Sequence, residues 1–158
     1  MTDQIDNLKI IGWREWVRLP DIGIKRLKAK IDTGARSSSL HAYDLEIEDV
    51  ADGQQVKFKV QPLQKNRERV IEASMPISEF REIRSSNGQT TTRPVIRTQL
   101  VISGCSYDID ITLFNRSKMG FRMLIGREAL AGRFTVDSAQ SFCGWKPKKK
   151  TIDSRGGI

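Results

Sequence analysis

The chain has 158 residues and a formal net charge of +8 at pH 7, and such a length suits one domain that buries ~70% of the surface of its unfolded chain. Cys105 and Cys143 are too few for a disulfide scaffold, and no stretch approaches the ~18 apolar residues of a membrane span. Because residues 1–6 also lack the basic start and apolar run of a signal peptide, we expect a cytoplasmic protein with ordinary, reduced cysteines.

Half of the excess positive charge lies at the C-terminal end. Residues 146–158 hold five lysines and arginines against one aspartate, a net charge of +4. A basic end with few apolar residues is typical of a solvated, disordered tail, and its alternative is an arm for an anionic partner. We predict a flexible N-terminus at residues 1–7, a folded β-barrel domain at residues 8–145 and a basic disordered tail at residues 146–158.

Residues 8–31 predict two strands joined by a turn at residues 20–23, because strand-forming residues flank a Pro-Asp-Ile-Gly sequence. In the second strand apolar residues alternate with lysines, so one face is buried and the strand ends at Asp32. Trp13 and Trp16 are either core residues or interface anchors, and we expect them in the core.

The stretch Ile31-Asp32-Thr33-Gly34-Ala35 places a carboxylate between an apolar strand end and a glycine. One interpretation is the catalytic loop of an aspartic peptidase half. The other is an ordinary turn in which Asp32 accepts backbone N–H groups and Gly34 supplies a positive φ. The motif by itself leaves both interpretations open.

Residues 43–47 and 56–60 predict a hairpin, because both alternate apolar with charged residues around a turn near Asp52-Gly53. The outward acids of the first strand face the outward lysines of the second, a match that helps to fix the pairing of the strands. Residues 62–78 are polar and irregular, and they form either a loop or an embellished edge of the sheet.

Two further hairpins follow. Residues 80–93 flank Asn87-Gly88, the strongest short-range indication of a two-residue hairpin turn. Residues 95–113 form the other, with a turn at residues 103–106. The regular spacing of these strands predicts a small all-β barrel.

The last elements are a strand, a helix and a closing strand. Leu124-Ile125-Gly126 is an apolar strand end closed by glycine, and residues 127–131 are good helix formers with Gly132 as a C-terminal stop. Phe134 and Val136 predict the closing strand.

In order and spacing, the Asp32-Thr33-Gly34 loop and the later Leu124-Ile125-Gly126-Arg127 strand resemble the retropepsin pattern. The chain resembles more narrowly the bacterial retropepsin-like proteins often labelled "ATP-dependent zinc protease". The stretches that carry this resemblance are Asp32 to Ala42, Arg84 to Gly88, Arg93-Pro94 and Met119 to Phe121. It runs from about Gly12 to Asp137, and it implies a small closed acid-protease barrel with one short helix after the hydrophobic-Gly strand.

The resemblance also implies an activity and partners. Members are associated with ATP-grasp glutamate ligases of the RimK type, which add glutamates to a ribosomal protein, and some members are thought to trim those glutamates. We therefore expect an aspartic endopeptidase that acts on an acidic, glutamate-rich protein tail, with a ligase or a ribosomal protein as a further partner.

Peptide hydrolysis without a metal or a serine or cysteine nucleophile needs a water molecule held between two carboxyl groups that share one proton. This chain has one Asp-Thr-Gly sequence, so the resemblance implies a homodimer with Asp32 of each copy in the dyad. Thr33 would hydrogen-bond across the axis and Gly34 would offer its N–H. The implied supporting residues are Ala35, Leu124, Ile125, Gly126 and Arg127.

The resemblance places a flap over the substrate at the Asn87-Gly88 hairpin. The residues that we expect to bind substrate are Arg36, His41, Arg84, Asn87, Gly88 and Arg93. For His41 the alternative is a packed strand residue. Where well-known retropepsins have an acid to pair with Arg127, this chain has Arg36, which places a guanidinium beside the cleft and suits an acidic substrate.

Zinc is not expected, because the chain has one histidine and two cysteines that are far apart, whereas a catalytic zinc needs about three protein ligands. No phosphate-binding Gly-x-x-x-x-Gly-Lys sequence occurs, so we expect no cofactor. The alternative function is a non-catalytic basic barrel that binds RNA, the ribosome or an acidic protein segment. Sparse aromatic residues speak against RNA.

Overall fold

The computed structural model of the chain describes residues 7–63, 69–85, 87–115 and 120–148. These residues contain twelve strands and one short helix, α2 (Arg127–Leu130). The strands are β1 (Lys9–Gly12), β2 (Arg14–Leu19), β3 (Ile24–Asp32), β4 (Ser38–His41), β5 (Tyr43–Val50), β6 (Gly53–Val60), β7 (Ile71–Pro76), β8 (Glu79–Arg84), β9 (Thr90–Ile102), β10 (Cys105–Phe114), β11 (Met123–Gly126) and β12 (Phe134–Asp137).

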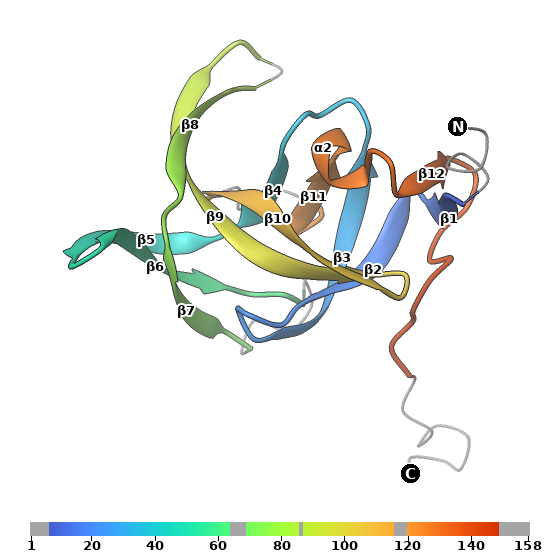
Figure 1. Cartoon of the computed structure of the whole chain (residues 1–158), viewed down its shortest axis with the longest axis horizontal. Helices are drawn as coiled ribbons and strands as arrows, with labels where there is room; N and C mark the ends of the chain where they lie inside the picture. The colour runs from blue at the N-terminus through green and yellow to red at the C-terminus, as the bar shows by residue number, and fades with distance from the viewer. Residues whose placement is uncertain (1–6, 64–68, 86, 116–119, 149–158) are drawn as a thin grey trace.

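Six strands close into a barrel in the order β10-β4-β11-β3-β2-β9, because β9 also pairs with β10. β8 is added to β9 outside the closed ring, and the β8–β9 hairpin rises beyond the barrel (Figure 1). The predicted all-β barrel with one short helix after the hydrophobic-Gly strand is confirmed. No described helix is long and apolar enough to cross a membrane.

Alternation along the strands fills the barrel. Leu27 and Ala29 on β3 are fully buried, while Lys25 and Lys30 on the same strand are exposed. On β10, Ile111 is likewise fully buried. This period of two is the physical reason why the sequence pattern predicts these strands correctly.

β11 lies between β3 and β4, parallel to β3 and antiparallel to β4. In this register Ile125 faces Ile31 and Gly126 faces Asp32. A strand that comes more than ninety residues later thus reaches the end of the strand that carries the Asp-Thr-Gly loop.

The hairpin predicted from residues 43–60 is confirmed, and β5, β6 and β7 form a separate three-stranded sheet. Its cross-strand charges meet as the sequence predicts, with Lys57 Nζ 3.1 Å from Glu48 Oε1 and Lys59 Nζ 3.3 Å from Asp44 Oδ2. β7 comes from the segment whose sequence allows either a loop or an embellished edge, and it pairs with β6 along six residues. The edge interpretation therefore holds for residues 71–76.

The N-terminal prediction of a single first strand is wrong. The predicted strand is interrupted at Trp13. The residues before it form β1, which leaves the barrel and pairs in parallel with the closing strand β12. The reason is a close contact at Gly12, where a Cβ atom would lie 2.3 Å from the carbonyl oxygen of Gln140. Trp13 N–H donates to that same oxygen over 2.9 Å.

The expectation that Trp13 and Trp16 lie in the core is also wrong, since both are half-buried. Trp13 meets the ring of Phe121 edge-on with centroids 5.9 Å apart, and Trp16 stacks on Phe142 with centroids 6.0 Å apart. Trp16 therefore packs beneath the C-terminal segment, which we define as residues 138–148.

The predicted two-residue turn at Asn87-Gly88 is too short. Ser85 N–H donates to the carbonyl oxygen of Gln89 over 2.8 Å, and Gly88 N–H donates to the carbonyl oxygen of Ser85 over 2.9 Å. Gly88 has φ of +86°, the left-handed conformation that closes a longer connection of this kind. The turn predicted at residues 103–106 is shorter than expected, because Ser103 and Gly104, both with positive φ, connect β9 to β10, which already begins at Cys105.

The predicted terminal segments lie mostly outside the described residues. Residues 1–6 of the predicted flexible N-terminus and residues 149–158 of the predicted tail are not described. Residues 146–148 are described, and they continue the C-terminal segment without helix or strand.

Candidate active site

Asp32 is the last residue of β3, and its half-buried side chain stands at the start of the Asp-Thr-Gly loop. Gly34 N–H donates to Asp32 Oδ1 over 3.1 Å, and Ala35 N–H donates to the carbonyl oxygen of Asp32 over 3.1 Å. Gly34 does not have a positive φ, which removes one feature of the ordinary-turn interpretation. A Cβ atom at Gly34 would instead lie 3.3 Å from Asp32 Oδ1, so the glycine permits a close approach to the carboxylate.

Gly126 supports the loop from behind. A Cβ atom at this position would lie 2.5 Å from the carbonyl oxygen of Ser37, closer than real Cβ atoms come to backbone. Gly126 N–H also donates to Ser38 Oγ over 3.0 Å in the buried interior. Only glycine therefore lets β11 pass this close to the segment that follows the catalytic loop.

Arg127 also supports the loop. Its Nη1 donates to the carbonyl oxygens of Thr33, over 3.5 Å, and Gly34, over 3.3 Å, while its backbone N–H donates to the carbonyl oxygen of Ala35 over 2.8 Å. In place of the acid that the retropepsin pattern provides, this guanidinium binds backbone carbonyls of the catalytic loop.

Arg36 has an acidic partner that the sequence pattern does not indicate. Arg36 Nε donates to Glu128 Oε1 over 3.0 Å, and Glu128 N–H donates to the carbonyl oxygen of Arg36 over 3.2 Å. Their side chains are 77% and 53% exposed, so water screens the ion pair and it contributes little to stability. The helix α2 thus supplies a carboxylate beside the loop, and that carboxylate occupies Arg36.

A cleft of about 630 Å³ lies between the Asp-Thr-Gly loop and β8. Its residues are Gly34, Ala35, Arg36, Ser37, Glu79, Arg81, Glu82, Ile83 and Arg84. Of the residues expected to bind substrate, Arg36 and Arg84 line this cleft. β8 therefore lies across from the Asp-Thr-Gly loop, in the place where the resemblance puts a flap strand.

Arg93 and His41 lie elsewhere. Arg93 is 5% exposed, and its guanidinium carbon lies 4.0 Å from the ring centroid of Phe114. His41 is 7% exposed and its ring stacks on Tyr43 with centroids 6.2 Å apart. Burial, and then the nearby charge of Arg122, lower the pKa of His41 and favour its neutral form. Both residues fit packed positions in the barrel wall, the alternative that the sequence leaves open for His41.

Asn87 and Gly88 lie at the exposed tip of the β8–β9 hairpin and do not line the cleft. The Ser85 hydroxyl donates to Asn87 Oδ1, and Gln89 N–H donates to the same oxygen over 3.2 Å. Asn87 thus shapes the tip of the hairpin by local hydrogen bonds.

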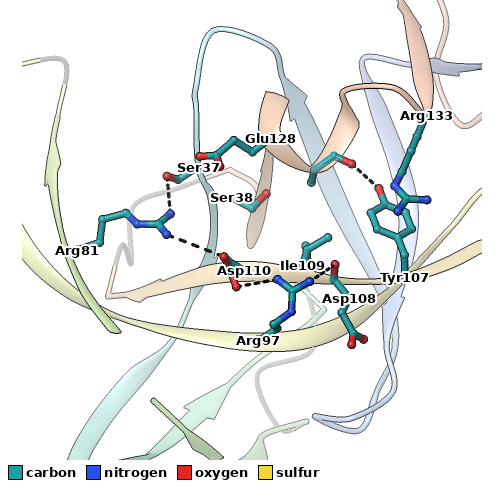
Figure 2. A pocket seen from close by; sticks show the side chains of 11 residues that line it. Ser37, Ser38, Arg81, Arg97, Tyr107, Asp108, Ile109, Asp110, Glu128 and Arg133 are labelled. Atoms are coloured by element: carbon teal, nitrogen blue, oxygen red, sulfur yellow. Dashed lines mark hydrogen bonds and ion pairs between the residues drawn. The ribbon is translucent and has the colours of Figure 1, made fainter. Parts of the chain in front are cut away.

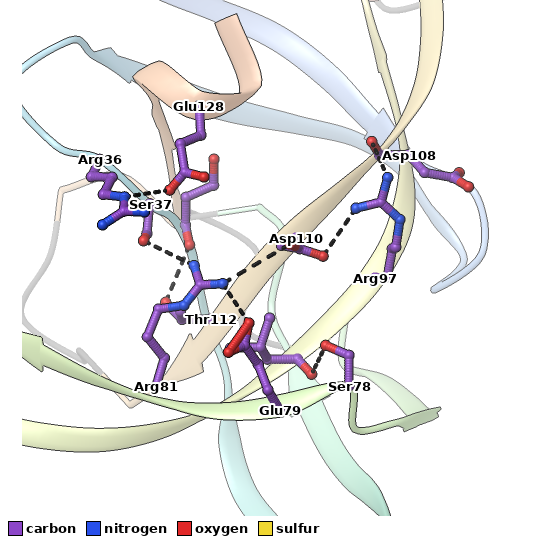
Figure 3. Close-up of polar contacts among 12 residues, drawn as sticks. Arg36, Ser37, Ser78, Glu79, Arg81, Arg97, Asp108, Asp110, Thr112 and Glu128 are labelled. Atoms are coloured by element: carbon purple, nitrogen blue, oxygen red, sulfur yellow. Dashed lines mark hydrogen bonds and ion pairs between the residues drawn. The ribbon is translucent and has the colours of Figure 1, made fainter.

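Arg81 is a site residue that the sequence does not predict. Its Nη1 donates to Ser37 Oγ over 3.1 Å, and its Nη2 donates to Glu79 Oε2 over 2.7 Å and lies 4.0 Å from Asp110 Oδ2 (Figure 3). Arg81 thereby links β8 to the segment after the catalytic loop and to the barrel wall. The strand register could have indicated this role. Arg81 faces Arg93 across the two strands, and two adjacent arginines each need a partner of their own.

A smaller pocket of about 200 Å³ shares Ser37 and Arg81 with the cleft (Figure 2). Arg97 and Asp110 pair across its lining, with Arg97 Nη1 3.1 Å from Asp110 Oδ1. Tyr107 also lines it and donates its hydroxyl to the carbonyl oxygen of Ala129 on α2 over 2.6 Å. These contacts link β10 to β9 and to α2.

Among the described residues, no group of three or more His, Cys, Asp or Glu side chains is arranged to hold a metal ion. Cys105 and Cys143 are both free thiols, the first partly buried and the second exposed.

Known proteins similar to this chain include several named "Probable alpha-L-glutamate ligase". The protein of Parasynechococcus marenigrum is 45% identical over 128 residues, 81% of this chain and 28% of the relative. That of Desulfotalea psychrophila is 43% identical over 131 residues, 83% and 28% of the two chains. That of Shewanella halifaxensis is 38% identical over 153 residues, 97% and 33% of the two chains. This chain thus spans a third or less of these longer proteins.

The barrel is also similar to the crystal structure of a protein from Legionella pneumophila that is described as having unknown function. The TM-score is 0.72 and the sequence identity is 26%, and the match covers 85% of this chain and 97% of that one. Residues 10–147 match the model of a family described as "RimB-like: Retropepsin-like aspartic endopeptidase RimB". This match covers the Asp-Thr-Gly loop, β8 and β11 together. The chain therefore belongs to the RimB-like family of retropepsin-like aspartic endopeptidases.

Proposed function

We propose that this chain is one half of a homodimeric aspartic peptidase that hydrolyses peptide bonds in an acidic, glutamate-rich protein tail. The observation that carries the proposal is the geometry of Asp32, whose half-buried carboxylate is held at the end of β3 by Gly34 N–H, with β11 packed close behind the loop. A cleft of about 630 Å³ adjoins this loop and leaves room for an extended peptide.

The proposed chemistry needs two carboxyl groups. One, ionised, accepts a proton from the attacking water while the other, protonated, donates its proton to the oxygen of the scissile carbonyl. The tetrahedral intermediate then collapses, the C–N bond breaks and the leaving amine takes up a proton. No covalent enzyme intermediate forms, so the chain needs no nucleophilic side chain.

A second copy of the chain would supply the second carboxyl group. Among the described residues, the Asp32 carboxylate accepts its hydrogen bond from Gly34 and pairs with no other acid. Thr33 is exposed beside it, so its hydroxyl is accessible to a partner loop. A two-fold axis beside Asp32 brings two identical loops together, which is the arrangement expected for an isologous dimer.

Two observations support an acidic substrate. Arg84 and Arg36 line the cleft, and Arg36 is already paired with a carboxylate, Glu128, that a substrate glutamate resembles chemically. The relatives that contain a region similar to this chain are named for glutamate ligation. A peptidase that removes glutamates and a ligase that adds them would act on the same tail, so a glutamate ligase or its protein substrate is the proposed partner.

Asp32→Asn tests the proposal. The amide can neither act as a base nor share the proton, so cleavage of a glutamate-rich peptide should fall by about 10³-fold or more while the fold is retained. Purified protein should sediment as a dimer, and mixing parent with Asp32→Asn chains should form inactive heterodimers, so that activity falls with the square of the parent fraction. A monomer that cleaves the peptide, or activity that survives Asp32→Asn, would refute the two-chain dyad.

A further inference from the structure

A further concave site lies away from the cleft, between the β2–β3 turn and the C-terminal segment. We call it the basic groove, and its volume is about 600 Å³. Its cationic lining residues are Arg18, Lys25, Arg26, Arg69 and Lys148. No aspartate or glutamate belongs to its lining. The function proposed above does not use any of these residues.

The cations of the basic groove lack acidic partners within the part of the chain that the structure describes. Each of the ion pairs found there joins residues of other regions. Asp21 lies in the β2–β3 turn between Arg18 and Lys25, and its Oδ2 accepts the N–H of Gln99 over 3.0 Å and the hydroxyl of Thr98 over 3.4 Å. Within the described residues, the groove therefore presents positive charge that no carboxylate pairs.

The far wall of the groove is fixed by a buried carboxylate. Glu15 is fully buried, and it accepts the N–H groups of Gly12 over 2.7 Å, Cys143 over 2.9 Å and Gly144 over 3.0 Å. These bonds attach the C-terminal segment to β2 immediately before Trp145. The ring of Trp145 then lies 4.0 Å from the guanidinium carbon of Arg18. The groove is thus a built feature of the fold.

The basic groove and the cleft lie at opposite ends of the barrel. Ile24 in the groove begins β3 and Asp32 ends it, a separation of roughly 26 Å at the usual rise per strand residue. Figure 1 shows the catalytic loop and the β8–β9 hairpin at the upper end of the barrel and the β2–β3 turn at the lower end. One short peptide cannot occupy both sites.

We propose that the basic groove is a docking site for the distal part of the acidic polypeptide whose other part enters the cleft. This inference rests on the proposed function and extends it from the scissile bond to the length of the tail. Carboxylates of a glutamate-rich segment complement the unpaired cations, while Pro20, Ile24 and Pro147 provide an apolar floor for the methylene groups of glutamate.

An acidic polypeptide fits the groove better than a nucleic acid does. Proteins that bind single strands stack successive bases on several aromatic rings. The groove has one aromatic residue, Trp145, and the guanidinium of Arg18 already covers a face of its ring. A groove that has several cations but no free aromatic ring suits a chain of carboxylates better than a chain of bases.

The distance between the two sites predicts a dependence on tail length. An extended peptide advances about 3.4 Å per residue, so at least about eight residues are needed to reach from the cleft to the groove in a straight line, and more around the surface. Tails shorter than this should gain nothing from the groove, while longer tails should bind more tightly without any change at the cleft.

Binding is measured first, with a fluorescent sixteen-residue polyglutamate peptide and full-length protein carrying Asp32→Asn to prevent cleavage. Adding Lys25→Glu should weaken binding about 10-fold at low salt, because one attractive charge becomes repulsive, and added salt should erode the affinity of the Lys25 parent. Lys57→Glu is the matched control, since Lys57 is also a strand lysine that lies outside the groove and the charge change is the same. It should change binding less than about 2-fold, as a distant surface charge does.

Two results would overturn the docking site. Equal losses for Lys25→Glu and Lys57→Glu would show a response to net charge alone. Tighter binding of a single-stranded polyuridine oligomer than of polyglutamate, lost on Lys25→Glu, would assign the groove to nucleic acid. Circular dichroism and thermal unfolding of each variant establish that the fold is intact.

Activity then separates the docking site from the proposed function. With Asp32 present, Lys25→Glu should raise KM about 10-fold for a sixteen-residue glutamate tail and leave a four-residue peptide unchanged, with kcat unaltered for both. An equal rise of KM for both peptides would refute docking in the groove. No cleavage of either peptide by the parent protein would refute the proposed peptidase, whereas the binding measurement would still decide whether the groove holds an acidic chain.

Discussion

The two ends of the barrel use arginine in different ways. At the cleft, Arg36 is paired with Glu128 and Arg81 is held by Glu79, Ser37 and Asp110. At the basic groove, the arginines and lysines have no carboxylate partner among the described residues. Paired guanidinium groups are fixed in direction and position the strands around a site, whereas unpaired ones attract any anion of suitable length.

The paired cations of the cleft therefore position strands, whereas the unpaired cations of the groove attract anions. A substrate carboxylate that binds Arg36 or Arg81 in the cleft must exchange with an internal one, so binding at these two residues depends on geometry and responds weakly to salt. A carboxylate that enters the groove replaces water and counterions, so binding there depends on ionic strength. Substitutions of residues that support the cleft or the groove should therefore have different consequences.

The largest structural effect is expected at the cleft end, from Gly126→Ala. The new Cβ atom would lie 2.5 Å from the Ser37 carbonyl oxygen, so β11 or the loop must move, at a cost of about 3 kcal/mol in the free energy of unfolding. Chemical denaturation measures this cost, and peptide cleavage should fall with it because Asp32 shifts. Gly120→Ala is the control, since a Cβ atom there meets nothing within 4 Å. Equal stability of the two variants would contradict the close packing at Gly126.

The next effect is expected at the groove end, from Glu15→Gln. The carboxylate accepts three backbone N–H groups in the buried interior, and a side-chain amide would turn an N–H group toward at least one of these donors. We expect a loss of about 2 kcal/mol in the free energy of unfolding and earlier amide hydrogen exchange at Cys143 and Gly144.

Glu15→Gln also sharpens the comparison of the two ends. Polyglutamate binding by the groove should weaken, because Trp145 and Pro147 lose their anchor, while cleavage of a four-residue peptide should stay unchanged. A substitution of the exposed Glu46 by Gln provides the control. Loss of short-peptide cleavage without loss of the groove would show that the two ends do not act separately.

Arg81→Met tests whether paired arginines position the flap strand. The variant keeps much of the apolar volume but removes the bonds to Ser37 and Glu79. We expect KM to rise about 3- to 10-fold as β8 loses its link to the catalytic loop, in line with about 1 kcal/mol for a hydrogen-bonded charge that is partly exposed. Arg84→Met removes an exposed cleft cation without such links. Its KM should rise for acidic peptides and not for neutral ones, whereas Arg81→Met should affect both.

The smallest effect is expected from Tyr107→Phe, which removes the hydrogen bond to Ala129 on α2 and costs about 1 kcal/mol. Burial raises the pKa of Tyr107 from 10.0 to about 12. The neutral hydroxyl therefore stabilises the fold fully below pH 10, and this contribution is lost as the pH rises through about 12. Denaturation curves between pH 9 and 11.5 should fall less steeply with pH for the Phe variant, and parallel curves would refute the assignment.

Much of the barrel follows from sequence alone because its cause is local. Alternation of apolar and charged residues determines β3, β6 and β10, and the order of an Asp-Thr-Gly loop and a later Leu-Ile-Gly strand predicts the candidate catalytic centre. The acids on β5 and the lysines on β6 likewise pair as their alternation predicts. Each of these features depends on neighbours in the chain or on the fixed period of a strand.

Other features depend on contacts between distant segments, and only the tertiary structure decides them. Gly12 breaks the first strand because the carbonyl of Gln140 lies against it, and Glu128 pairs with Arg36 across ninety-two positions. Arg93 is buried on Phe114 although its sequence position suggests a substrate contact. The basic groove exists because Glu15 brings residues 143–148 beside the β2–β3 turn. Local patterns specify which face of a strand is buried. The packing of the whole chain decides which distant side chain pairs with a charged group.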